Sequence, residues 1–225
     1  MKNKLDSIRD SIDLWSIYLP DCRDELESCR ESLADEELER AEKFFKPTDA
    51  ESFILCRGLL RRILGGVLDV APSSILFERN GYGKPRIPNT EIEFNVSHSR
   101  DRLLIAITAG RSLGVDIEFR RSGINMEAIA DRWFAPEERE FFQTLEKPES
   151  GFFDIWAKKE AYVKALGTGI FKELHSFVVP LGGEPGFPTL GKTNEWFFQP
   201  LEIDPAYAAA LVADAPVVPV RLRTL

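Results

Sequence analysis

Three charged residues in one apolar stretch are the first candidates for chemistry. Residues 151–169 (GFFDIWAKKEAYVKALGTG) have the length and composition of a helix, and Gly167 stands where a glycine commonly ends one. At about 100° per residue, Lys159 falls within a wide apolar face, and Glu160 and Lys164 are i and i+4 neighbours. Burial of these charges is costly unless each has a partner, so the helix either holds an internal ion pair or carries chemistry. The opposite face, which we expect to be exposed, contains Asp154, Lys158 and Ala165.

Two further carboxylates lie in the short segment LGVDIEF, residues 113–119. On a strand, Asp116 and Glu118 point to the same side with their Cα atoms about 6.5–7 Å apart, close enough to share one small cation. As a lone pattern they could equally be the exposed acids of an ordinary strand. Together with Glu160 they make three carboxylates without histidine or cysteine, which suits a hard cation such as Mg²⁺. The sequence therefore predicts a magnesium site between strand and helix, with a phosphate-bearing substrate.

Basic residues that could hold phosphate lie in the N-terminal half of the chain. Ser97 and His98 stand just before two arginines, in a segment that we expect to form the bend of a hairpin. An anion site and a structural histidine are equally compatible with this pattern. Lys84, in a turn with two glycines, is either a phosphate ligand or a solvated side chain. Arginines on a long helix, Arg57 among them, are further candidates because arginine and lysine both recognise phosphate.

Local patterns predict the elements that position these residues. In the first part of the chain we expect strands at 13–19 and 75–78, helices at 35–45 and 48–68, a turn at 80–85, and a hairpin over 91–109 with its bend at 97–102. After residue 110 we expect a strand at 113–119, helices at 125–134, 136–145 and 151–166, and strands at 176–179, 195–199, 207–212 and 217–222. Strand, helices and antiparallel strands thus occur twice. This order predicts an α+β fold of two similar halves, residues 1–110 and 111–225, each an antiparallel sheet packed with helices.

Composition limits the classes of function. A net charge of −8 over 225 residues argues against nucleic acid as the main partner. No apolar run reaches the roughly 18 residues of a membrane span, and the N-terminal segment lacks the apolar stretch of a secretory signal. The three cysteines, Cys22, Cys29 and Cys56, show no close metal-binding spacing. We therefore expect a reduced, cytoplasmic protein without a nucleic-acid or membrane partner.

Three motifs resemble the signature of one enzyme family. They are FNVSHS (94–99), GVDIE (114–118) and WAKKEAYVKALGTG (156–169), with YGKP (82–85) ahead of them. In order and separation they resemble the Sfp-type 4′-phosphopantetheinyl transferases. The resemblance implies a monomer of two similar α+β halves with coenzyme A bound between them. It also implies transfer of the 4′-phosphopantetheine arm of coenzyme A to a serine of an apo acyl or peptidyl carrier protein, with release of adenosine 3′,5′-bisphosphate.

The same resemblance assigns a role to each candidate in the second half. Asp116, Glu118 and Glu160 would ligate Mg²⁺, or Mn²⁺ in its place, at the pyrophosphate of the coenzyme. Glu160 would also take the proton from the attacking serine, directly or through water. Lys164 would neutralise charge that builds on the pyrophosphate, and Lys159 would help to bind it. Glu138, in FAPEE, matches an acidic position near the metal.

In the first half the resemblance concerns the coenzyme itself. Ser97, His98 and Lys84 would hold its 3′-phosphate and adenine end, and Arg40 and Arg57 are available as further basic ligands. Glu37 and Phe53 depart from the family pattern, because they occupy places where a basic or hydroxyl residue is expected.

The sequence also suggests where a carrier protein would dock, and it leaves two alternative functions open. A docking surface is expected just after GVDIE, from Arg120, Arg121, Arg132, Trp133 and Phe134. The first alternative is a Mg²⁺-dependent hydrolase of a nucleotide pyrophosphate, because the same three acids would serve it and water would replace the serine. The second alternative is a binding module without catalysis, against which the complete set of acids and Lys164 argues.

Overall fold

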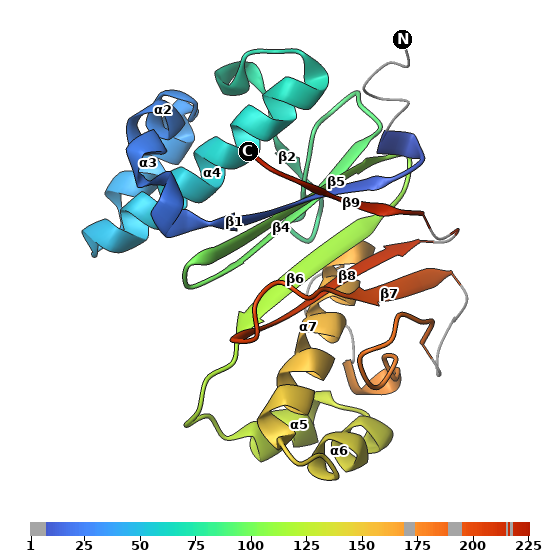
Figure 1. Cartoon of the computed structure of the whole chain (residues 1–225). Coiled ribbons are helices and arrows are strands. Elements are labelled where there is room, and N and C mark those ends of the chain that lie inside the picture. Colours follow the sequence, from blue (N-terminus) through green and yellow to red (C-terminus); the bar gives the residue numbers. More distant parts are fainter. Residues whose placement is uncertain (1–7, 169–173, 189–194, 215, 217) are drawn as a thin grey trace.

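Two sheets, one of four strands and one of three, form the framework of the described fold, and each is covered by its own helices (Figure 1). A separate pair of short strands accompanies the first sheet. The computed structural model describes residues 8–168, 174–188, 195–214, 216 and 218–225. Its α+β architecture of two similar halves is the one that the sequence predicts. Among the helices so described, none combines the length and the apolar character that crossing a bilayer requires.

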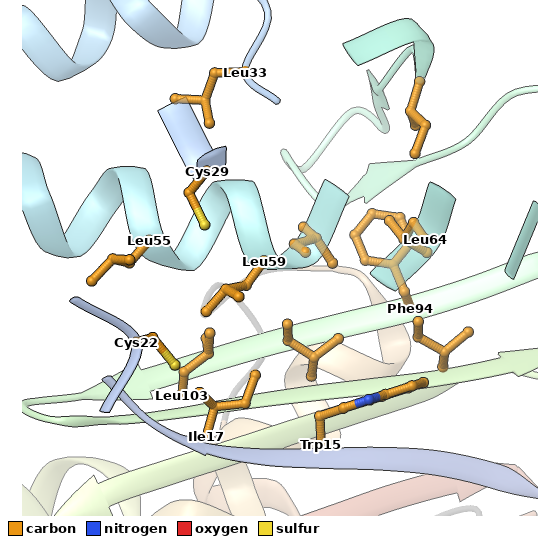
Figure 2. Close-up of a cluster of buried hydrophobic side chains, with 14 of the residues drawn as sticks. Trp15, Ile17, Cys22, Cys29, Leu33, Leu55, Leu59, Leu64, Phe94 and Leu103 are labelled. Carbon is orange, nitrogen blue, oxygen red and sulfur yellow. The ribbon is translucent and has the colours of Figure 1, made fainter. Parts of the chain in front are cut away.

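The first half is a sheet with a long helix on one face. Its elements are β1 (Ile12–Tyr18), η1 (Leu19–Glu25), α2 (Leu26–Glu31), α3 (Asp35–Glu42), α4 (Pro47–Leu68), η2 (Pro72–Ser74), β2 (Glu78–Arg79), β3 (Pro85–Arg86), β4 (Ile92–Ser99) and β5 (Arg102–Ala109). Leu59 and Leu64 of α4 pack against Trp15 of β1 and Phe94 of β4 in a continuous apolar core (Figure 2). This packing fixes the position of β4, which carries the FNVSHS motif.

The second half repeats the arrangement. Its elements are β6 (Leu113–Phe119), α5 (Met126–Trp133), α6 (Pro136–Gln143), α7 (Pro148–Leu166), η3 (Leu174–Ser176), β7 (Trp196–Pro200), β8 (Tyr207–Asp214) and β9 (Val220–Arg223). The strand order β6-β8-β7 matches the order β1-β5-β4 of the first sheet, and all of these neighbours are antiparallel. The last strand, β9, departs from the repeat because it pairs in parallel with β1 of the first sheet.

The same kind of helix N-terminal cap occurs in both halves. The carboxylate of Glu37 accepts a hydrogen bond from the amide of Ala34 at 3.0 Å, and that of Glu138 accepts one from the amide of Ala135 at 2.8 Å. Each glutamate thereby satisfies an amide at the start of its helix, which has no partner within the helix itself. The shared A-x-E-E pattern is a residue-level trace of the repeat that element order alone did not reveal. The boundary at residue 110, and a separate task for each half, stay predictions.

The structure departs from the sequence prediction at two expected strands and one bend. Residues 75–77 lie between η2 and β2, and only the following pair belongs to a strand. Ser176 is the last residue of η3, and residues 177–179 follow it without forming a strand. In the first run Ile75 is buried but Leu76 is exposed, whereas Phe177, Val178 and Val179 of the second run are all buried. The bend of the hairpin is only two residues long, Arg100 and Asp101, so Ser97 and His98 belong to β4.

Candidate active site

Side chains of β4 join the two halves at the edge of β6. Every second residue of β4 between positions 95 and 99 has a polar side chain that accepts a hydrogen bond from the backbone of β6. The bonds run from the amide of Val115 to Asn95 (2.9 Å), from that of Ile117 to Ser97 (3.3 Å) and from that of Phe119 to Ser99 (3.0 Å). We call these three residues the β4 ladder. It satisfies backbone donors that would otherwise be buried without a partner at the junction.

Asp116, Lys164 and Ser97 meet at the centre of this junction. The Nζ atom of Lys164 lies 2.6 Å from Oδ1 of Asp116, and the hydroxyl of Ser97 donates to the same oxygen at 2.8 Å. Lys164 also donates to the Ser97 hydroxyl at 2.9 Å. The partner of Lys164 is therefore Asp116 on β6, and not Glu160 on its own helix as the internal-pair alternative requires.

A glycine on β6 permits this close approach of strand and helix. A Cβ atom at Gly114 would overlap the carbonyl oxygen of Ala161 and the amide nitrogen of Ala165 in α7. Because residue 114 is a glycine, β6 lies directly against the turn of α7 that carries Lys164. The other end of that turn is fixed by Gly167, whose positive φ of 65° ends the helix as expected.

Glu160 and Glu118 complete the acidic group. Burial raises the pKa of Glu160 to about 7; Asp116 and Glu118 act in the same direction, whereas Lys164 opposes them. Burial, followed by the charge of Asp116, also raises the pKa of Glu118. The predicted acids from β6 and α7 thus lie near enough to influence one another, with Lys164 among them and Arg121 acting on Glu118 as well.

The predicted metal site is not preformed in the described part of the chain. Among those residues, no three His, Cys, Asp or Glu side chains converge closely enough to hold an ion as they stand. The donor chemistry nevertheless fits a hard cation. Oδ2 of Asp116 and Oε1 of Glu160 are buried without a hydrogen-bond partner in the described structure, and such oxygens are ligands that Mg²⁺ accepts.

Lys159 lies outside this group, contrary to its predicted role in pyrophosphate binding. Its side chain is 0% exposed, and Nζ lies 2.8 Å from a carboxylate oxygen of Glu138, itself 0% exposed. The same ammonium donates to the carbonyl oxygens of Leu174 (2.6 Å) and Phe177 (2.9 Å). All three donors of Lys159 therefore have protein partners. Glu138 likewise serves this buried pair and its helix, so neither residue is available to a ligand.

The expected solvent face of α7 is wrong at two of its three residues, because only Asp154 has an exposed side chain. Lys158 is buried and donates to the carbonyl oxygens of Pro180 (2.6 Å) and Gly182 (2.7 Å), and Ala165 is buried as well. The helix is enclosed on nearly all sides because β6 and β8 pack on it together with α6 and the segment after η3.

A pocket of about 810 Å³ lies on the other side of β4. Basic residues that line it are Arg40, Arg57, His98 and Arg100. Arg57 is also ion-paired with Glu37, which explains the acidic residue found at that unexpected position. Burial, and then the charge of Lys164, lowers the pKa of His98, so the pocket and the acidic group influence each other across one strand. Arg100, the first of the two arginines that follow His98 in the sequence, also lines the pocket, and its guanidinium lies 3.6 Å from the ring centroid of Phe119.

Known proteins resemble this chain over both of its halves. The family model of the 4′-phosphopantetheinyl transferase superfamily matches residues 112–212, and the model "4′-phosphopantetheinyl transferase, N-terminal" matches residues 20–110. The 4′-phosphopantetheinyl transferase HetI of Nostoc sp. is 37% identical over 171 residues, which cover 73% of this chain and 72% of HetI. The 4′-phosphopantetheinyl transferase Sfp of Bacillus subtilis is 30% identical over 213 residues, 92% of this chain and 94% of Sfp.

The chain belongs to the Sfp-type 4′-phosphopantetheinyl transferases. It is therefore an enzyme, and its reaction is the transfer of a 4′-phosphopantetheinyl group. The two family models together span both halves of the fold, so the β4 ladder and the acidic group lie inside the matched regions.

In this transferase the side chain of Lys84 binds other residues of the protein. Its Nζ atom donates to the carbonyl oxygens of Leu113 (3.1 Å) and Ala165 (3.4 Å) and lies 3.7 Å from the carboxylate of Glu93. Nearby, the amide side chain of Asn80 donates to the carbonyl oxygen of Gly167 at 2.8 Å. The turn thus holds the C-terminal end of α7, and Lys84 does not line the basic pocket as its predicted 3′-phosphate role requires.

The predicted docking surface of the transferase is only partly a surface. Phe134 is 1% exposed and stacks on Phe152 in the core, so it cannot anchor a partner. Arg120 is bound internally, to Asp154 at 2.7 Å and to the carbonyl oxygen of Ser150 at 2.8 Å. Of the residues predicted to form the docking surface, Arg121 and Arg132 are exposed. The guanidinium of Arg132 lies over the ring of Trp133.

Proposed function

We propose that the enzyme transfers the 4′-phosphopantetheine arm of coenzyme A to a serine of an apo acyl or peptidyl carrier protein and releases adenosine 3′,5′-bisphosphate. The observation that carries this proposal is the position of β4, which presents His98 to the basic pocket and Ser97 to the acidic group. Both parts of the site belong to one chain, and all three cysteines are free, so we also propose a cytoplasmic monomer.

The basic pocket is the proposed place of the nucleotide end of the coenzyme. Arg40 and Arg100 line it and have no ion pair in the described structure, so their charges are available to phosphate. Phe44, Phe53 and Phe94 supply apolar lining on which a purine can pack. From this pocket the pyrophosphate would reach the acidic group along β4.

The metal would be held by Asp116 and Glu160, with Glu118 beside them. When bound, Mg²⁺ neutralises negative charge at the pyrophosphate. Charge neutralisation and positioning are the main requirements of a phosphoryl transfer. The free oxygens of Asp116 and Glu160 support this assignment, and the carboxyl-only set favours Mg²⁺ or Mn²⁺ over a softer metal.

The remaining chemistry falls to Glu160 and Lys164. Glu160 is the proposed general base for the serine hydroxyl, because it lies beside Asp116 with a carboxylate oxygen that has no partner in the described structure. A bound cation would favour the ionised carboxylate, which is the form that accepts a proton. Lys164 is 28% exposed at its side chain and therefore reachable, and its ammonium would stabilise negative charge on the departing bisphosphate.

The test is the intact mass of an apo carrier protein incubated with the enzyme, coenzyme A and Mg²⁺. The proposal expects the carrier to gain the mass of one phosphopantetheinyl group and adenosine 3′,5′-bisphosphate to form in equal amount. The same mixture without carrier separates transfer from hydrolysis. Release of the bisphosphate at the full rate in that second mixture would contradict the proposal.

Asp116→Asn tests the metal assignment. We expect a loss of about 10- to 100-fold in kcat at ordinary Mg²⁺ concentration, because an amide cannot replace the carboxylate charge that Lys164 and the metal require. A Mg²⁺ titration of initial rates measures it, with thermal unfolding as a check on folding. Normal turnover at the same Mg²⁺ concentration would remove Asp116 from the metal site.

Arg40→Ala tests the coenzyme pocket. Loss of one charged hydrogen bond to a phosphate corresponds to about 1.5–3 kcal/mol, so we expect the KM for coenzyme A to rise about 10- to 100-fold with little change in kcat. Arg30→Ala is the matched control, because Arg30 is an exposed arginine that does not line this pocket. An equal effect, or no effect, in both variants would place the nucleotide elsewhere.

A further inference from the structure

Ser97 has a hydroxyl whose hydrogen-bonding capacity is fully used by protein atoms. The residue as a whole is 7% exposed. Its single donor goes to Oδ1 of Asp116, and its two acceptor positions receive Nζ of Lys164 and the amide of Ile117. No capacity remains for the 3′-phosphate of a coenzyme, to which the family resemblance assigns this residue.

The three partners of Ser97 come from different parts of the second half, whereas Ser97 itself belongs to the first. Asp116 and Ile117 lie on β6, and Lys164 lies on α7. The hydroxyl therefore fixes one carboxylate and one ammonium relative to each other and to the strand that lines the basic pocket. It also occupies Oδ1 of Asp116, so that the second oxygen, Oδ2, stays without a protein partner in the described structure.

We propose that Ser97 is a positioning residue of the transfer reaction, which holds the carboxylate of Asp116 and the ammonium of Lys164 in the arrangement that the bound substrate and metal require. The inference rests on the proposed function of the same site. Groups that orient a metal ligand in this way typically change metal affinity or activity about 10- to 100-fold when they are removed.

The β4 ladder offers a matched control. Ser99 is the same residue type on the same strand and accepts the same kind of bond, from the amide of Phe119 at 3.0 Å. The described structure gives its hydroxyl no contact with Asp116 or Lys164. Ser97→Ala and Ser99→Ala therefore each free one amide of β6, but only the first also releases the two charged groups.

The first measurement is the steady-state rate of carrier modification as a function of Mg²⁺ and coenzyme A. For Ser97→Ala we expect kcat about 10- to 100-fold lower and the Mg²⁺ concentration at half-maximal rate raised, with the KM for coenzyme A changed less than about twofold. Ser99→Ala should keep all three values near those of the wild type. Ser97→Thr, which keeps the hydroxyl, should recover most of the rate.

The second measurement needs no turnover. Mn²⁺ is titrated into each protein with coenzyme A but without a carrier, and free Mn²⁺ is followed by electron paramagnetic resonance. Weaker Mn²⁺ binding in Ser97→Ala, with wild-type binding in Ser99→Ala and a cooperative thermal unfolding transition in both, supports the proposal. Equal Mn²⁺ affinities and equal rates in the two alanine variants would overturn it, even if the wild type modifies a carrier normally. A wild type that binds coenzyme A and Mn²⁺ but modifies no carrier would instead overturn the proposed function, and the Mn²⁺ affinities would still decide the role of Ser97.

Discussion

Replacing Glu160 with glutamine is expected to remove most transfer activity while coenzyme A still binds. The variant keeps the size of the side chain but cannot accept the proton of the attacking serine, a contribution of about 10²- to 10⁴-fold to the rate. Coenzyme binding should persist because the basic pocket lies on the other side of β4, away from α7. Single-turnover mass gain of an apo carrier and calorimetric titration of coenzyme A measure the two quantities separately.

Glu149→Gln is the matched control for this variant, since Glu149 is an exposed glutamate in the first turn of the same helix. It should transfer at the wild-type rate. Full transfer by Glu160→Gln would count against Glu160 as base and as metal ligand, and a joint loss of coenzyme binding would point to a collapsed site.

Replacing Lys159 with methionine is expected to destabilise the whole protein by about 3–5 kcal/mol, because Glu138 would be left as a buried charge without its cation. That loss is a large part of the total stability of an ordinary domain, about 5–15 kcal/mol. The carbonyl oxygens of Leu174 and Phe177 would lose their donor as well. Urea unfolding measures the free energy of unfolding.

The double variant Glu138→Gln with Lys159→Met distinguishes the buried pair from simple loss of packing. Removing both charges should recover part of the stability lost by Lys159→Met alone, since residues in direct contact are not additive. Lys147→Met, at an exposed lysine before the same helix, should change stability little. A loss below about 1 kcal/mol in Lys159→Met would mean that the pair contributes no more than an exposed one.

Local patterns were enough to predict the elements that carry the acids. β6 and α7 lie where alternation, helical periodicity and Gly167 place them, and Asp116 and Glu160 come together as the motifs imply. The ion-pair partner of each lysine could not be predicted. A helical wheel shows to which side of the helix a side chain points, but it does not show which other element of the fold packs on that side. Lys159 and Lys164 follow similar patterns, yet one meets Glu138 of α6 and the other Asp116 of β6.

The position of Ser97 and His98 was mistaken for a related reason. The bend of the hairpin contains no glycine or asparagine, and Arg100 adopts a positive φ of 49° that its residue type does not announce. A wide bend was therefore the natural prediction. The alternation of Asn95, Ser97 and Ser99 was a usable signal, since polar residues at every second place indicate one face of a strand.

The repeated fold allows the chain to serve as its own comparison. β1 and β6 have the same length, and each pairs antiparallel with the strand next to it in the shared order, β5 for β1 and β8 for β6. Counted from their first residues, Trp15 and Ile17 correspond to Asp116 and Glu118. Both residues of the earlier copy are packed in a hydrophobic core. The two strands thus serve different purposes at matching positions: the first builds the hydrophobic core there, and the second carries the acidic side chains of the site.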